Sequence, residues 1–408
     1  MINHLEKLSI YYQKALLIKP DNAIVHSKLG NLYEAQMNFE EATYHYIKSI
    51  EFDPSYFHNY WKLKYSLLQL NRWEQEIESN LLEQGITTLS QAIESQPNFP
   101  FAQVLLGNLL TQQGKIEEAI ACYQNASYKQ INLSYPELVK NHWNPHQKTQ
   151  PDFLIPGFIK SGTSSLYNYL ISHPQILPAV DNGLCFFTDF FEQELDWYLA
   201  HFPSIPASMN YITGETTPIY IYFPSITKKI FHLFPNIKLV ILLRNPVDRA
   251  ISSYFHQHKI NCGYKLIQDN IDNILEKMPS LLDKLHTFVW LEPSMIKKYR
   301  SPSRQDVFSY HLMNSLYIYY LKEWLNVFPR EQFLFVKSED LFSNPSVTMK
   351  KVFSFLNLPD YPLAEYPNYN PGSYNPISDD LRQTLAEFFR PHNQKLEEYL
   401  GMKFNWDE

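Results

Sequence analysis

The chain has 408 residues, of which 45% are hydrophobic and 15% aromatic, enough to build a substantial core in two or three domains. Its 42 acidic and 35 basic residues give a net charge of −7, which argues against a broad basic surface for nucleic acid or an anionic membrane. Three widely spaced cysteines support neither a disulfide framework nor a metal cluster. Because there is no secretory signal pattern and no apolar run of about 18 residues, we expect a soluble cytoplasmic protein without a membrane span.

An internal repeat occupies the first third of the chain. The sequence LGNLY (29–33) recurs as LGNLL (106–110), and FEEATYHY (39–46) recurs as IEEAIACY (116–123), both at an offset of 77 residues. Small residues recur among larger apolar ones at helical spacing, which lets antiparallel helices pack closely. With the 34-residue interval between Pro20 and Pro54, this pattern resembles the tetratricopeptide repeat. The resemblance implies three helical hairpins over residues 1–128, either as a packing scaffold or as a protein-binding surface.

The helical periodicity ends after residue 128, where Asn, Pro, His and Gln accumulate, so we place a linker at residues 129–150. Beyond it, short apolar runs at 153–159, 237–243 and 333–341 alternate with helical stretches such as 163–171 and 246–258. Buried strands separated by helices predict a parallel sheet covered on both faces. The expected organisation is therefore an all-α repeat domain at 1–128 followed by an α/β domain at 151–408.

The sequence GFIKSGTSSL (157–166) follows the first expected strand and opens a helix. Backbone N–H groups at the helix start, several hydroxyls and the ammonium group of Lys160 would converge there on an anion. In the loop of a P-loop ATPase the lysine follows the second glycine, whereas here Thr163 follows Gly162. The loop therefore favours a phosphorylated ligand handled without metal, and a Ser/Thr-capped helix is the alternative for this stretch alone.

A second anion-binding pattern follows the apolar run at 237–243. Arg244 stands at the end of this expected strand, and Ser252 lies about two turns into the next helix. Ligands of open parallel sheets bind at the carboxyl ends of strands, and an arginine can hold a phosphate through two hydrogen bonds. Two such sites on neighbouring strand ends suit a nucleotide that carries phosphate at both its 5′ and 3′ positions.

Together, FIKSGTSSLYNYLISHP (158–174) and LVILLRNPVDRAISSY (239–254) resemble the nucleotide motifs of sulfotransferases that use 3′-phosphoadenosine-5′-phosphosulfate, closest to the bacterial and heparan-sulfate-type branch. The resemblance covers about residues 151–408 and implies a P-loop-like sulfotransferase domain. It also implies that the 3′-phosphate is bound by Arg244 and Ser252. The 5′ side would be bound by Lys160, Ser161, Gly162, Thr163, Ser164 and Ser165, and a late turn that closes over the nucleotide would contribute Gly372, Ser373 and Tyr374.

The resemblance further implies in-line transfer of a sulfuryl group to a hydroxyl or amine without a metal, with Lys160 neutralising the departing phosphate oxygen. Carbohydrate-acting members carry an acidic residue before a Phe-Phe pair, but this chain has Gly183 there, in DNGLCFF (181–187). Three residues could replace it as the base. They are His256, whose residue type titrates near neutral pH, then Glu215 in GETTPIY, and last Asp181.

We therefore expect an enzyme, a sulfotransferase whose acceptor is a saccharide or, through the repeats, a peptide, with a possible protein partner on the repeats and no nucleic acid. One alternative is a scaffold protein that binds the nucleotide but has lost transfer activity through Gly183. Another is a P-loop kinase, which Mg·ATP would stabilise against thermal unfolding more than adenosine 3′,5′-bisphosphate would.

Overall fold

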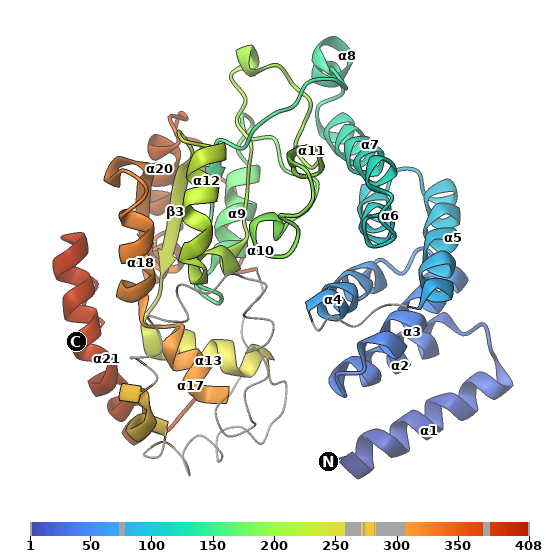
Figure 1. The fold of residues 1–408 in the computed structure, drawn as a ribbon, viewed down its shortest axis with the longest axis horizontal. Coiled ribbons are helices and arrows are strands. Elements are labelled where there is room, and N and C mark those ends of the chain that lie inside the picture. The colour runs from blue at the N-terminus through green and yellow to red at the C-terminus, as the bar shows by residue number, and fades with distance from the viewer. Residues whose placement is uncertain are drawn as a thin grey trace. The chain divides into compact units, whose positions relative to one another are not determined.

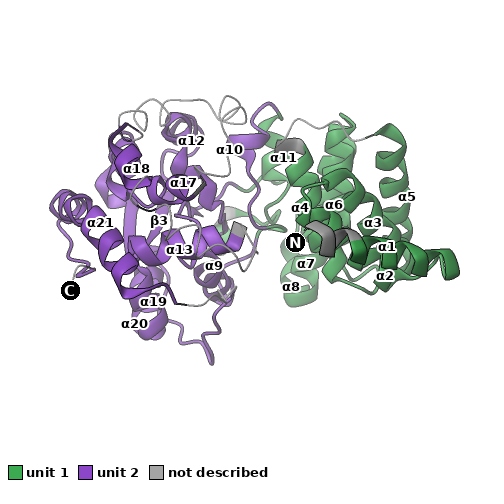
Figure 2. Ribbon diagram, turned by 90° about the horizontal axis from the view of Figure 1, so that it is seen from below, with its two compact units in different colours: residues 1–149, 179–181, 193–209 green, residues 150–178, 182–192, 210–408 purple. Residues whose placement is uncertain are grey.

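The computed structural model describes residues 2–72, 78–257, 274–280, 307–369 and 376–406, together with residues 271 and 282. The chain divides into two compact units (Figure 2). The first unit comprises residues 1–149, 179–181 and 193–209, and the second comprises 150–178, 182–192 and 210–408. The predicted linker at 129–150 contains the end of one helix and the whole of a short one, α8 (Pro136–His142).

The first unit begins with a series of helices in chain order (Figure 1). Helix α2 packs against α3 and α6 against α7, while α4 and α5 each contact α3 and α6. The repeat region is therefore all-helical, as predicted. The bounds before α8 are α1 (Ile2–Ile18), α2 (Ala23–Ala35), α3 (Phe39–Phe52), α4 (His58–Arg72), α5 (Ser79–Ser95), α6 (Pro100–Gln112) and α7 (Ile116–Ser134), and the unit also contains α11 (Leu195–Leu199) and the 3-10 helix η1 (Ala207–Met209).

The 77-residue offset in the sequence corresponds to one packing contact made twice. Gly30 on α2 faces the ring of Tyr46 on α3, and Gly107 on α6 faces the ring of Tyr123 on α7. A Cβ atom added at either glycine would come within 2.5 Å or 2.6 Å of the ring, so only glycine permits this helix approach. Each tyrosine hydroxyl also donates to the asparagine that follows the glycine, at 3.2 Å for Tyr46 and 2.9 Å for Tyr123.

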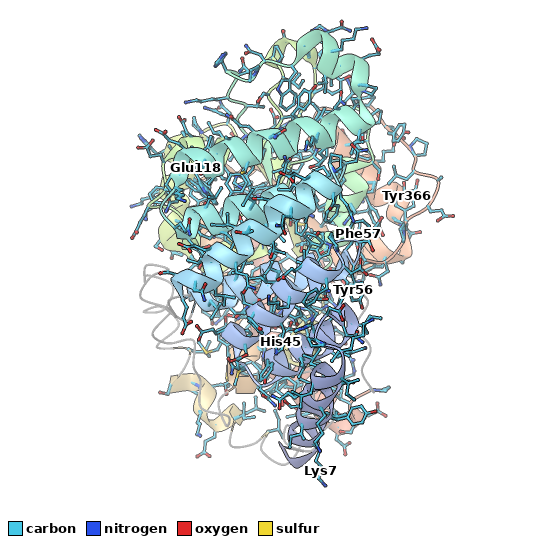
Figure 3. All side chains as sticks on the ribbon, turned by 90° about the vertical axis from the view of Figure 1, so that its right-hand side faces the viewer. Lys7, His45, Tyr56, Phe57, Glu118 and Tyr366 are labelled. Carbon is cyan, nitrogen blue, oxygen red and sulfur yellow. The ribbon has the colours of Figure 1, made fainter. Side chains whose placement is uncertain are left out.

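Aromatic side chains also fill the turn between α3 and α4. Tyr56 and Phe57, labelled in Figure 3, lie in this turn, and His45 on α3 lies buried among the repeat helices. The Phe57 ring contacts the Phe99 ring with centroids 4.4 Å apart, and Phe99 directly precedes α6. Tyr56 and Phe57 nevertheless remain exposed, so this aromatic contact lies at the surface of the repeats.

The second unit contains a four-stranded parallel sheet with the order β2-β1-β3-β4. Its strands are β1 (Phe153–Leu154), β2 (Gly214–Glu215), β3 (Lys238–Leu243) and β4 (Phe333–Lys337). The predicted α/β class is confirmed, but the predicted strands 153–159 and 333–341 are too long. Ile155 and Phe158 are fully buried although they lie beyond β1, and the N–H of Ile155 still bonds to β2, at 3.0 Å from the carbonyl oxygen of Glu215. The apolar run therefore continues in the core after the strand has ended. In the predicted strand 333–341, β4 ends at Lys337 and helix α19 begins at the next residue.

Helices cover the sheet, whose central strand β3 is fully buried from Leu239 to Leu243. Residues of α9 and α20 form one core cluster with Val240, Leu242 and Val336. The helices of this unit are α9 (Thr163–Ile171), α10 (Phe186–Asp189), α12 (Thr227–Leu233), α13 (Pro246–Gln257), α17 (Val307–Met313), α18 (Tyr317–Leu325), α19 (Ser338–Ser343), α20 (Pro345–Phe355) and α21 (Asp379–Leu400), with 3-10 helices η2 (Pro218–Tyr222), η3 (Pro224–Ile226) and η5 (Arg330–Gln332). None of the described helices has both the length and the hydrophobicity needed to cross a lipid bilayer.

Candidate functional site

The carboxyl ends of the parallel strands bring the two predicted anion-binding motifs together. The chain leaves β1 into the loop before α9 and leaves β3 at Arg244, and β1 and β3 are neighbours in the sheet. Arg244 Nη1 donates a hydrogen bond to the carbonyl oxygen of Lys160 at 3.0 Å, across 84 residues of sequence. From β4, the Ser338 hydroxyl donates to the carbonyl oxygen of Ser161 at 2.6 Å. Three strand ends therefore hold one loop.

The backbone of this loop turns through two left-handed residues. Lys160 has φ of 72° and Gly162 has φ of 95°. The left-handed conformation costs about 1–2 kcal/mol for a residue other than glycine, and it persists where the surroundings enforce it, commonly at functional sites. Here the hydrogen bonds from Arg244 and Ser338 supply that restraint. At Gly162 an added Cβ would also lie 3.0 Å from the ring of Phe342, so the loop requires glycine for two reasons.

Hydroxyl side chains occupy the end of the loop and the first turn of α9. Ser161 and Ser165 are fully buried, Thr163 is buried, and Ser164 is half-buried. The Ser165 hydroxyl accepts from the backbone N–H of Tyr369 at 3.1 Å, but the Ser161 hydroxyl has no hydrogen-bond partner among the described residues. No side chain caps the first turn of α9. Uncapped N–H groups beside an unpaired buried hydroxyl are the groups that an oxygen-rich anion binds.

Two cationic residues belong to this site: Lys160 within the loop and Arg244, which bonds to it. Burial, together with the positive charge of Arg244, lowers the pKa of Lys160. Arg244 forms no ion pair with a carboxylate among the described residues, and its carbonyl oxygen accepts from the Tyr317 hydroxyl at 2.7 Å. The nearby carboxylate of Glu339 instead accepts from the backbone N–H of Asn245 at 2.8 Å. Lys160 and Arg244 therefore make the electrostatic potential at this loop positive, which attracts an anion.

Arg249 on α13 is a further cation that the sequence analysis missed. It is fully buried, and its guanidinium donates to three neutral oxygens: the Ser315 hydroxyl at 2.7 Å, the Ile159 carbonyl at 3.3 Å and the His311 carbonyl. No carboxylate pairs with it among the described residues. Ile159 directly precedes Lys160, so Arg249 both holds the loop and adds an uncompensated charge beneath it. The only sequence signal was an arginine that precedes the apolar pair Ala250 and Ile251 in this helix.

Helix α13 also carries Ser252 and His256. Ser252 is buried, whereas His256 is exposed near the end of the helix. The two residues are four apart, so they share one face of the helix. The structure therefore brings the predicted 3′-phosphate serine and the first candidate base onto the same side of α13, although it does not bring them into direct contact.

Glu215, the second candidate base, ends β2 and is fully buried. Its carboxylate accepts from the Thr217 hydroxyl at 2.5 Å and from the Tyr220 hydroxyl at 3.3 Å. Burial and the charge of Glu215 raise the pKa of Tyr220 well above its usual value, which keeps this phenol protonated as a donor. The neighbouring Thr216 hydroxyl, where family members often have a lysine, is buried without a partner among the described residues.

The segment that lacks the usual carboxylate has a distinctive backbone. Gly183 has φ of 72°, and its N–H donates to the carbonyl oxygen of Thr216 at 3.0 Å. An added Cβ would meet nothing within 4 Å, so space exists for a side chain but the conformation disfavours one. Asp181, the third candidate base, pairs with Lys64 at 2.5 Å in the first unit, so its carboxylate is already engaged.

Some predicted positions cannot be placed. Gly372, Ser373 and Tyr374 lie outside the described residues. Within the described part of the chain, no group of three or more His, Cys, Asp or Glu side chains is arranged to hold a metal ion.

Comparisons with known proteins agree with this geometry. Residues 150–369 match the family model of the sulfotransferase domain, and residues 102–128 match a tetratricopeptide repeat. The chain is 26% identical over 313 residues to the membrane-associated sulfotransferase kil1 of Dictyostelium discoideum, which covers 63% of this chain and 66% of that protein. It is 27% identical over 287 residues to heparan sulfate glucosamine 3-O-sulfotransferase 6 of Mus musculus, covering 64% of this chain and 75% of that protein.

A crystal structure of a sulfotransferase from Alicyclobacillus acidocaldarius superposes with a TM-score of 0.47 at 24% identity, covering 64% of this chain and 100% of that one. The sulfotransferase model spans more than half of the chain, and the predicted resemblance is confirmed. This chain therefore belongs to the sulfotransferase family of enzymes and carries a tetratricopeptide repeat at its N-terminal side.

Proposed function

We propose that this protein transfers a sulfuryl group from 3′-phosphoadenosine-5′-phosphosulfate to a hydroxyl or amine of a saccharide. The observation that carries the proposal is the hydrogen bond from Arg244 to the Lys160 carbonyl, because it joins the loop after β1 to the end of β3. A relative named for heparan sulfate supports a saccharide acceptor. The repeats suit contact with a protein partner or with the acceptor itself.

The donor would use both halves of this sheet edge. The 5′-phosphosulfate would bind the Lys160 ammonium group, the Ser161 hydroxyl and the N–H groups that open α9, helped by the positive charge of Arg249. The 3′-phosphate would bind Arg244 and Ser252. Lys160 would then stabilise the charge that develops on the phosphate oxygen as its bond to sulfur breaks.

The acceptor oxygen or nitrogen would form the new bond to sulfur, and its proton would pass to a base. We assign that role to His256, because it is exposed and shares a helix face with Ser252. Glu215 is the second candidate, but its carboxylate is fully buried and accepts two hydroxyl hydrogen bonds. Replacing His256 or Glu215 by glutamine tests whether that residue is the base, because glutamine cannot take up the proton but can still form hydrogen bonds. We expect His256→Gln to lower kcat by about a hundredfold and Glu215→Gln to act through stability instead.

The function itself is tested by label transfer. Sulfur-labelled donor is incubated with polysaccharide and peptide pools, using wild-type protein and Lys160→Ala. We expect label in the polysaccharide pool, and a loss of at least about a hundredfold in the variant. Equal silence of both proteins, with adenosine 3′,5′-bisphosphate still bound, would show a nucleotide-binding scaffold instead of an enzyme. Label only in the peptide pool would contradict the saccharide acceptor.

A further inference from the structure

The first unit contains two pieces of the sulfotransferase region in addition to the repeats. These pieces are residues 179–181 and 193–209, coloured with the repeats in Figure 2. Between them, residues 182–192 belong to the second unit and include Gly183. The chain therefore leaves the first unit after Asp181 and re-enters it at Gln193, so the first unit holds both ends of this segment.

A buried ion pair holds the leading end. Lys64 on α4 places its Nζ 2.5 Å from Asp181 Oδ1, and the two side chains are only 10% and 5% exposed. The N–H of Val180 also donates to the carbonyl oxygen of His201 at 2.9 Å. Breaking a buried ion pair leaves an uncompensated charge, so this contact strongly favours one position of Asp181.

A buried aromatic cluster holds the trailing end. The indole N–H of Trp197 on α11 donates to the Thr111 hydroxyl on α6 at 2.9 Å. The His201 ring stacks on the Tyr123 ring of α7, with centroids 3.9 Å apart. Trp197, His201 and Tyr123 are each at most 2% exposed, so residues of the repeats and of the sulfotransferase region share one core.

Two residues separate these contacts from the candidate site. Gly183 follows Asp181 by two positions, which span at most about 7 Å of backbone. Its N–H is bonded to the carbonyl oxygen of Thr216, the residue after Glu215. A displacement of Asp181 would therefore also move Gly183, and through its hydrogen bond the residue that follows β2.

We propose that the repeats position the segment 182–192 for the acceptor, with Lys64 as the positioning residue. This inference rests on the proposed function, because it assigns the segment to the acceptor side of a sulfuryl transfer. The repeats then act as a structural part of the enzyme, and the acceptor step depends on a lysine that lies 96 positions before Lys160 in the sequence.

The test uses the full chain and a matched control on the same helix. Lys64→Met breaks the pair with Asp181, whereas Lys62→Met breaks the pair between Lys62 and Glu34, which is 2.9 Å long with side chains 17% and 13% exposed. We expect Lys64→Met to lower kcat/KM for the acceptor about tenfold or more, because misplacement of binding groups is costly. Affinity for adenosine 3′,5′-bisphosphate should stay within about twofold of wild type in both variants, since both lie in the first unit.

A second measurement needs no activity. Hydrogen exchange at residues 182–192 should be faster in Lys64→Met than in wild type and unchanged in Lys62→Met. Lys64→Arg, which preserves the charge, should restore both the exchange pattern and the activity. If Lys64→Met fails to fold, Trp197→Phe removes the hydrogen bond to Thr111 and part of the buried ring, and it should shift exchange in the same direction.

The outcomes separate the two proposals. Unchanged exchange at 182–192 in Lys64→Met would overturn the positioning role, whatever the activity. If exchange is faster in Lys64→Met than in wild type but the wild-type protein transfers no label, the positioning of the segment stands and only the proposed function is contradicted.

Discussion

Each unit of the molecule contains a buried cation, and the two cations are compensated differently. In the first unit, Lys64 lies 2.5 Å from the carboxylate of Asp181. In the second unit, Arg249 is fully buried and donates only to the neutral oxygens of a serine and two backbone carbonyls. A buried charge requires compensation, which the chain itself supplies to Lys64. At the sheet edge we propose that a bound anion supplies the compensation, and the two units would then differ as a structural core differs from an anion-binding site.

The largest expected effect comes from removing the uncompensated cation. Arg249→Met should weaken binding of adenosine 3′,5′-bisphosphate by about a hundredfold, because it removes a charge and frees the Ile159 carbonyl beside the loop. Titration calorimetry measures the affinity, and circular dichroism checks the fold. Arg249→Lys keeps the charge and should fall between wild type and Arg249→Met. Unchanged affinity in Arg249→Met would remove the contrast between the two units.

The next effect distinguishes the two halves of the nucleotide site. Arg244→Ala should weaken binding of adenosine 3′,5′-bisphosphate by about 10- to 100-fold, the size of a charge-assisted contact. Binding of adenosine 5′-monophosphate, which lacks the 3′-phosphate, should change only a few-fold. Equal losses for both ligands would show that Arg244 acts only by holding the Lys160 carbonyl.

Acid should weaken the first unit. Burial lowers the pKa of His45 to about 4 and that of His201 to about 3, and His45 Nδ1 lies 2.9 Å from His26 Nδ1. Between those values and the unfolded value of about 6.5, the unfolded state binds more protons, so stability falls as the pH falls. Each histidine can remove up to roughly 1.4 kcal/mol per pH unit. Thermal unfolding from pH 7 to pH 5 should show a smaller loss in His45→Gln, and an equal loss would contradict this assignment.

The smallest effect concerns the missing carboxylate. Because Gly183 is left-handed, Gly183→Glu should destabilise the protein by about 1 kcal/mol and should leave label transfer within about twofold of wild type. Gly183→Ala separates the backbone effect from the carboxylate effect. A large gain in transfer with Gly183→Glu and none with Gly183→Ala would mean that the absent carboxylate limits the reaction.

Local patterns predicted much of the fold. The repeat offset anticipated the contact of Gly30 with Tyr46, because a period in sequence becomes a period in packing. Helix α9 has the predicted bounds, since the loop glycine and the apolar spacing are both local signals. The first strand was predicted too long, because the buried apolar run continues past Leu154 as far as Phe158, and burial alone does not extend a strand.

Long-range contacts could not be predicted in this way. The pairing of Lys64 with Asp181 joins residues 117 positions apart, and nothing in either local sequence indicates it. Arg249 was missed because two of its partners are backbone carbonyls, which leave no signature in the sequence, and the third is a serine 66 positions away. The loop residues and Arg244 could be proposed because anion binding restricts residue types at strand ends, and the structure joins them by the hydrogen bond from Arg244 to Lys160.

We propose that the sheet edge binds a nucleotide bearing 3′- and 5′-phosphate groups without metal. Titration calorimetry with adenosine 3′,5′-bisphosphate in metal-free buffer, and separately with Mg·ATP, measures this binding. We expect the bisphosphate to bind at least about tenfold more tightly than Mg·ATP, and Lys160→Ala and Arg244→Ala each to weaken its binding. Tighter binding of Mg·ATP, or no binding of the bisphosphate, would show that the sheet edge is not a site for this nucleotide.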